Sequence, residues 1–231
     1  MLTENQINRL YKFCVQHYVR YYDVQIELVD HLANAIEAKM EADKNLDFEN
    51  ALSSVYAGFG RLGFSKIVSQ KTEAANKNIR KMRWQYFKEY FTIPKITITI
   101  LLLTIFTAIY YLVNKQYITT VFILLASICI VLGIGFVIYA ARRYKKPKKE
   151  LLCLKGENMY FSFGLLCQVP NYYNMFINHK QNNATELALH PAYYFIAVAF
   201  CIFAILLSLA SMKTYMKIED EALKNYPLAF Q

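Results

Sequence analysis

The sequence predicts an all-α membrane protein in which a small cytosolic helical domain precedes a four-helix transmembrane bundle. The chain is 56% hydrophobic and 16% aromatic, which is more apolar than an ordinary soluble domain of this size. Capped amphipathic helices precede residue 75, and long uncharged stretches follow residue 93. We therefore expect four parts: a cytosolic domain at 1–75, a juxtamembrane helix at 76–92, the bundle at 93–212 and a cytosolic tail at 213–231.

The first helix is expected from Glu4 to about Arg20. Thr3 and Gln6 can form a capping box, since the Thr3 hydroxyl can accept from the Gln6 backbone and the Gln6 amide can reach back. Behind this cap, apolar residues recur at helical spacing: Ile7, Leu10, Tyr11, Cys14 and Tyr18. The segment is charged and has no apolar stretch typical of a signal peptide, so we expect the domain to stay in the cytosol.

Asp23 is predicted to be the N-cap of a second helix that ends at Lys44–Asn45. Its expected buried face is Ile26, Val29, Leu32, Ala33, Ile36 and Met40. Its expected outer face is Glu27, Asp30, Asn34, Glu37 and Glu41. Asp47 should cap a third helix, which Gly58 and Gly60 close, and Ser65 should begin a fourth.

The fourth helix is expected to run on toward a membrane. Its later part combines cations with aromatic residues: Lys77, Arg80, Lys81 and Arg83 beside Trp84, Tyr86, Phe87, Tyr90 and Phe91. Long cationic side chains and amphipathic rings suit the headgroup layer of a bilayer. We therefore expect the lipid bilayer to be a partner of this segment.

Four membrane spans are expected, at about 94–113, 117–141, 158–177 and 191–212. Between Ile96 and Ala141 the only charged residue is Lys115, which lies in a very short turn. The third span is the weakest by insertion scales, because it contains several amide side chains and a proline: Asn158, Gln168, Pro170, Asn171 and Asn174.

The positions of the basic residues decide the topology. Eight Lys and Arg residues lie between Lys66 and Lys95, seven lie between Arg142 and Lys155, and three lie in the tail, whereas each intervening turn has one. The positive-inside rule then puts both termini in the cytosol. The residues expected to set the topology are Arg80, Lys81, Arg83, Arg142, Arg143, Lys145, Lys146, Lys148 and Lys149. A topology with three spans would instead put the tail, with its three lysines, on the outer side of the membrane.

No motif for chemistry is present, so we expect no enzyme activity and no cofactor. The five cysteines are scattered singly, and neither a phosphate loop nor a nucleophile motif occurs. Glu27 and His31 lie one helical turn apart and could share a metal, but the second Glu-x-x-His motif of a di-iron bundle is missing. We interpret them as part of a solvated acidic face.

Polar residues in the third span allow two interpretations. Gln168, Asn171 and Asn174 could line a substrate path, or they could form hydrogen bonds between helices of the bundle. We favour the second, and a small transporter or permease component stays the alternative function. Direct binding of nucleic acid is not expected, because the basic residues flank spans whose topology already explains them.

The stretches Tyr22–Leu32, Ile36–Glu37, Leu46–Leu52 and Gly63–Ile67 resemble the HAAS-like family of small helical signalling domains. The likeness covers about residues 1–70 and departs at Leu62–Ser65, where the family usually has Leu-Gly-Asp-Pro. The membrane half looks like four-span proteins of Bacteroidota that share this front end. Such proteins are often encoded beside a PadR-type transcriptional regulator. The resemblance implies non-enzymatic signalling at the bacterial inner membrane.

A cytosolic partner is expected to dock on the second helix. The basic juxtamembrane segment faces lipid, so the acidic outer face of the second helix is left for a protein partner. The expected docking residues are Glu27, Asp30, His31 and Glu37. The alternative is that Asp30 and His31 are structural and pair with helix ends or with Arg20 or Lys66.

Overall fold

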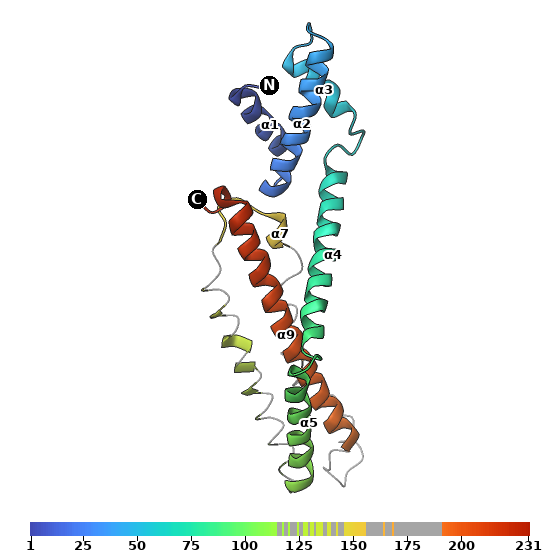
Figure 1. The fold of residues 1–231 in the computed structure, drawn as a ribbon, viewed down its shortest axis with the longest axis vertical. Helices are drawn as coiled ribbons and strands as arrows, with labels where there is room; N and C mark the ends of the chain where they lie inside the picture. The colour runs from blue at the N-terminus through green and yellow to red at the C-terminus, as the bar shows by residue number, and fades with distance from the viewer. Residues whose placement is uncertain are drawn as a thin grey trace, which may run out of the picture. The chain divides into compact units, whose positions relative to one another are not determined.

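The computed structural model describes residues 1–114, 146–155 and 191–231, with scattered positions between 117 and 142 and at 164 and 168. The regular elements of the described residues are helices, and these residues contain no β-strand (Figure 1). The helices whose bounds are described are α1 (Glu4–Gln16), α2 (Tyr22–Ala42), α3 (Phe48–Ala57), α4 (Ser65–Glu89), α5 (Lys95–Leu112), α7 (Leu152–Lys155), α9 (Pro191–Asn225) and a short 3-10 helix (Pro227–Ala229). Most of the expected second and third spans, 117–141 and 158–177, lies outside the described residues.

The chain divides into two compact units. Unit 1 consists of Met1–Ile79, Lys145–Gly156 and Ile218–Gln231, and unit 2 consists of Arg80–Tyr144 and Glu157–Lys217. Unit 1 thus contains the expected cytosolic domain together with two segments that the sequence analysis placed elsewhere, a basic loop and the end of the tail. Helices α4 and α9 each contribute residues to both units.

Helix α1 begins as predicted and ends earlier than predicted. Both hydrogen bonds of the Thr3–Gln6 capping box are present. The helix stops at Gln16 because Tyr18 adopts a left-handed conformation with φ +63°. The Val19 N–H then donates to the Cys14 carbonyl at 2.9 Å, and the Tyr18 N–H donates to the Val15 carbonyl. This is a Schellman cap, and it brings Val19 fully into the core.

We predict that Tyr18→Gly stabilises unit 1 by about 0.5–1 kcal/mol. A residue with a Cβ costs about 1–2 kcal/mol in the left-handed region, and glycine removes this cost. Part of the gain is lost because glycine also raises the conformational entropy of the unfolded chain. Tyr18 is 84% exposed, so little packing is lost. The matched control is Tyr18→Val, whose β-branched side chain should lower the melting temperature. A glycine variant that melts below the valine variant would contradict the capping role.

Asp23 does not cap α2, so that prediction was wrong. The N-cap is Tyr21, which makes no side-chain capping bond, and Asp23 lies inside the first turn. The buried stripe also differs from the expected one. Val29, Leu32 and Ile36 are buried as predicted, but the stripe also contains Val24 and Leu28, while Ile26 is only partly buried.

The turn at Leu62–Ser65 buries an aromatic side chain. Gly63 has φ +50°, and a Cβ at this position would lie 2.5 Å from the Tyr56 hydroxyl oxygen. That hydroxyl lies 2.8 Å from His17 Nδ1. Phe64, which is 1% exposed, packs edge-on against the rings of its neighbours: Phe13, His17, Tyr56 and Phe59. Glycine at 63 therefore lets the chain approach Tyr56 while it places Phe64 in the core. As predicted, Asp47 is the N-cap of α3.

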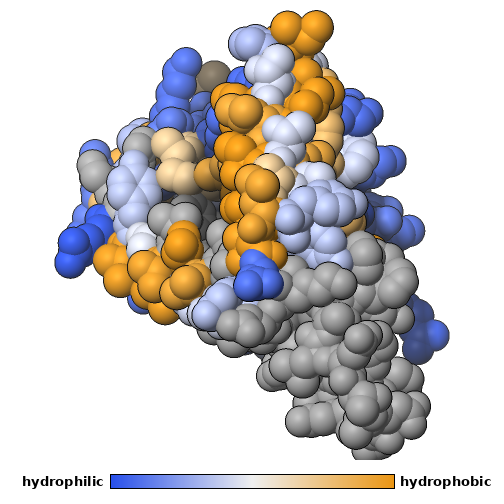
Figure 2. All heavy atoms as spheres, turned by 90° about the horizontal axis from the view of Figure 1, so that it is seen from below, coloured by the Kyte–Doolittle hydropathy of each residue, from blue (hydrophilic) through white to orange (hydrophobic). Residues whose placement is uncertain are grey.

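Two helices of the described part are long and apolar enough to cross a membrane, α5 and the stretch of α9 that begins at Tyr194. Only 6% of the α5 stretch is buried, whereas the core helix of a soluble protein would be mostly covered. Orange, apolar residues gather on the face drawn in Figure 2. The exposed apolar side chains of α5 include Ile98, Ile100, Leu101, Leu102, Leu103, Ile105, Tyr111 and Leu112.

Within unit 2, α5 and α9 pack antiparallel. Near the end of α5, the Tyr110 ring lies 5.0 Å from the ring of the fully buried Tyr194, whose hydroxyl donates to the Phe106 carbonyl at 3.1 Å. At the other end, Glu89 Oε2 lies 3.5 Å from Lys95 Nζ and 3.4 Å from Lys213 Nζ. The start of α5 and the later part of α9 therefore lie together.

Candidate functional site

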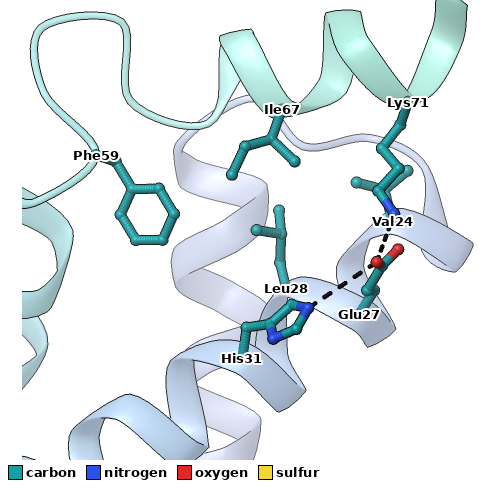
Figure 3. A pocket seen from close by; sticks show the side chains of 7 residues that line it. All are labelled: Val24, Glu27, Leu28, His31, Phe59, Ile67 and Lys71. Atoms are coloured by element: carbon teal, nitrogen blue, oxygen red, sulfur yellow. Dashed lines mark hydrogen bonds and ion pairs between the residues drawn. The ribbon is translucent and has the colours of Figure 1, made fainter. Parts of the chain in front are cut away.

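A small apolar groove lies in unit 1 between α2, the α3–α4 loop and the start of α4 (Figure 3). Its volume is about 210 Å³. Val24 and Leu28 of α2 contribute to its walls, and the side chains of Phe59 and Ile67 point toward Leu28 from the other elements. Its rim is polar and is formed by Glu27, His31 and Lys71.

The rim residues form a chain of polar contacts across the edge of the groove. Lys71 Nζ lies 2.5 Å from Glu27 Oε1, and His31 Nε2 lies 3.9 Å from the same oxygen (Figure 3). All three side chains are 44–67% exposed, so these pairs stabilise the fold by less than about 1 kcal/mol each. The rim groups can therefore exchange their partners for those of a ligand at little cost.

The four expected docking residues differ in their exposure and in their contacts. Glu27, Asp30 and His31 are exposed on α2, and two of them belong to the groove rim. Glu37 is half-buried and holds the start of the chain, since its Oε1 accepts from the Leu2 N–H at 2.6 Å and lies 3.7 Å from the N-terminal amine. In the described part of the chain, neither Arg20 nor Lys66 forms an ion pair with Asp30 or His31.

Sequence reasoning missed the other residues of the groove. Lys71 lies 44 residues from Glu27, and Phe59 comes from a loop between two glycines. The spacing of Ile67 and Lys71 at i and i+4 does place them on one face of α4. Only packing brings that face against α2.

A second constellation surrounds Asp23, at the first turn of α2. Its Oδ1 accepts from the Leu152 N–H at 2.9 Å, and its Oδ2 accepts from the Cys153 N–H at 3.0 Å. The Tyr22 N–H donates to the Glu150 carbonyl at 2.8 Å. Lys149 Nζ lies 3.9 Å from the centre of the Tyr22 ring, a cation–π contact. We call residues 146–155 the docked loop.

The docked loop also contacts the end of the chain. The Lys148 and Lys149 N–H groups donate to the Ala229 carbonyl at 2.8 and 3.3 Å. Leu151 is buried with Tyr22, Ala222 and Ala229, and Leu152 belongs to the main core of unit 1. Two residues expected to set the topology, Lys148 and Lys149, thus also make structural contacts.

The other expected topology residues are placed as follows. Arg80 and Lys81 are exposed on α4, whereas Arg83 is half-buried there. Arg142 and Lys146 are exposed, and Arg143 and Lys145 lie outside the described residues. Of the polar residues expected in the third span, Gln168 is helical and exposed, and Asn171 and Asn174 lie outside the described residues.

Burial keeps the thiols of unit 1 protonated. Desolvation, with a smaller effect of the Asp23 carboxylate, raises the pKa of Cys153 to about 12. Desolvation raises the pKa of Cys14 to about 11. Neither thiol is therefore a ready nucleophile at neutral pH. Within the described residues, no three His, Cys, Asp or Glu side chains gather in an arrangement that could hold a metal ion.

No protein family, curated protein or solved structure matches this chain. The resemblance of residues 1–70 to HAAS-like domains therefore stays a prediction. Function has to be argued from the groove, the docked loop and the apolar helices.

Proposed function

We propose that this protein is a non-enzymatic, multi-pass protein of the bacterial inner membrane whose cytosolic unit docks a protein partner in the groove between α2 and α4. The observation that carries the proposal is an apolar hollow with an exposed, charged rim. Such hollows receive one anchoring side chain of a partner, while the rim sets its orientation. A volume of about 210 Å³ is small for a metabolite pocket, which usually exceeds about 300 Å³.

The alternation of basic residues along the chain supports four spans. Seven Lys and Arg residues lie between Arg142 and Lys155 and three lie in the tail, whereas each intervening turn has one, Lys115 or Lys180. Crossings at 117–141 and 158–177 would put all the basic segments on one side of the membrane, as the positive-inside rule requires.

The charge pattern supports cytosolic termini. α5 begins at a cluster of cations and interfacial aromatics, in which Lys213 lies 5.7 Å from the ring centres of both Tyr86 and Tyr90. Such belts lie at a membrane–water boundary. The positive-inside rule then puts this boundary on the cytosolic side. A reporter fused after Gln231 that is active only outside the inner membrane would contradict this topology.

The docking proposal predicts that Asp30→Lys combined with His31→Ala abolishes capture of a specific partner. Both side chains are exposed on α2, and His31 belongs to the groove rim, so the change should alter the stability of unit 1 by less than about 0.5 kcal/mol. The measurement is quantitative affinity purification from native membranes, with wild type and variant compared protein by protein. The resemblance makes a PadR-type regulator system the first partner to look for.

The matched control is Glu41→Lys, which changes an exposed acid about 16 Å further along α2. It should retain the partner that the groove variant loses. Glu37 is not a suitable test position, because it anchors the N-terminus. Identical partner lists for wild type and the groove variant would show that docking takes place elsewhere.

A transporter or permease component stays the alternative function. In this alternative, Gln168, Asn171 and Asn174 line the substrate path. Changing all three to leucine should then abolish transport but leave docking intact.

A further inference from the structure

We propose that Asp23 is the positioning residue of a latch that ties the first turn of α2 to the docked loop, and through this loop to the membrane-spanning stretches on either side. The latch itself rests on contacts within unit 1. Its link to the membrane rests on the four-span topology proposed above. The inference goes beyond partner docking, because it concerns how the membrane part acts on the cytosolic unit.

The carboxylate of Asp23 holds the docked loop in its helical turn. Its two oxygens accept from consecutive backbone N–H groups, those of Leu152 and Cys153, at 2.9 and 3.0 Å. Hydrogen bonds to a carboxylate are about twice as strong as those between neutral groups. α7 has four residues, far fewer than a helix needs to persist by itself. Its conformation therefore depends on Asp23 and on the burial of Leu152, which is 5% exposed.

Tyr22 forms the second part of the latch. Its N–H donates to the Glu150 carbonyl, and its ring lies under the Lys149 ammonium. The same ring is buried with Leu151 and with Ala222 and Ala229 of the C-terminal segment. The docked loop is thus held by the start of α2 and by residues in and after the last turn of α9.

The two segments that contact the start of α2, the end of α9 and the docked loop, both continue into apolar sequence. Helix α9 runs without a break from Tyr194, in its apolar stretch, to Asn225. The docked loop lies between the expected spans 117–141 and 158–177. A shift of these segments along the membrane normal would pull on the bonds to Asp23. The next residue of α2, Val24, lines the groove, so the strain would reach the groove wall directly.

Hydrogen exchange of the full chain in lipid nanodiscs tests the latch. In Asp23→Ala, the amides of Leu152 and Cys153 lose their acceptor, and their exchange should accelerate about tenfold or more. The matched control is Glu41→Ala, which removes an exposed acid from the same helix and should leave exchange unchanged. The amides of α1 report whether the unit is folded. Unchanged exchange at 152 and 153 in a folded Asp23→Ala variant would overturn the proposal.

Asp23→Asn gives a second reading if the alanine variant does not fold. It keeps one oxygen acceptor and the shape of the side chain, but it removes the charge. Alkylation of Cys153 by iodoacetamide at pH 8.5 should become several-fold faster, because the loop that buries the thiol opens more often once one of the two carboxylate acceptors is lost. Cys14, fully buried in the core, should react at an unchanged rate. Equal Cys153 rates in wild type and Asp23→Asn would overturn the role of Asp23.

Bilayer thickness tests the link to the membrane. Spans adapt to thickness by tilting, so nanodiscs of phosphatidylcholine with 14-carbon or 22-carbon chains should shift them differently. We expect exchange at 150–155 to differ several-fold between the two in wild type and to be equally fast in both for Asp23→Ala. Exchange in wild type that is independent of thickness would overturn the link. A failure of partner capture would instead concern only the docking proposal.

Discussion

Replacing Leu152 by alanine is expected to lower the unfolding free energy of unit 1 by about 2–5 kcal/mol, although this residue lies far from the N-terminal helices in sequence. Leu152 is 5% exposed and packs in the same core as Leu10, Leu28 and Leu32. Removing such a side chain costs its transfer energy and leaves a cavity. In a unit of about a hundred residues, this loss should lower the melting temperature by about 10 °C or more.

The measurement is scanning calorimetry of the full chain in nanodiscs, with exchange of the α1 and α2 amides to assign the transition to unit 1. Lys146→Ala is the matched control, since Lys146 is exposed in the same loop and should change stability by less than about 0.5 kcal/mol. If Leu152→Ala melts like the wild type, the docked loop does not belong to the core.

Phe64→Ala is expected to cost about 3–5 kcal/mol, the other large effect. Phe64 lies in an edge-on cluster with four other rings, and aromatic pairs of this kind add about 0.5–1.5 kcal/mol beyond their burial. The same calorimetric transition should therefore move to a much lower temperature. Unit 2 should keep its helical signal, because Phe64 belongs to unit 1.

Leu62→Ala serves as the control for Phe64, since Leu62 is 68% exposed two residues earlier in the same turn. It should melt within a few degrees of the wild type. Phe64→Leu keeps most of the buried volume and should fall between the two. Equal losses for Leu62→Ala and Phe64→Ala would mean that the turn, and not the buried ring, stabilises this corner.

The sequence alone predicted the class of structure and most local features of unit 1. Helical spacing and capping residues act over three or four positions, so Thr3 with Gln6 predicted the start of α1 and Asp47 predicted the start of α3. The apolar stretches predicted helices able to cross a membrane, and α5 and α9 are two of them. Helix α1 was predicted too long, because its stop depends on a left-handed Tyr18 and no glycine marks the position.

The candidate site was predicted in part. Glu27 and His31 were identified from their spacing on an acidic helix, and they form part of the groove rim. Glu37 has the same residue type as Glu27 and was predicted on the same outer face, but its carboxylate contacts the N-terminal segment. Charge pattern on one helix could not separate these roles, since the difference lies in a contact with another segment.

Sequence by itself determined that this protein is helical, where its first helices begin, and which stretches can cross a bilayer, because hydropathy and capping are properties of neighbouring residues. Only the tertiary structure decided what Asp23 does. Its residue type and position are typical of an N-cap, yet its oxygens accept from Leu152 and Cys153, about 130 residues away. A carboxylate at a helix start accepts hydrogen bonds from the N–H groups that tertiary packing brings close to it, and residue spacing in the sequence does not predict which groups these are.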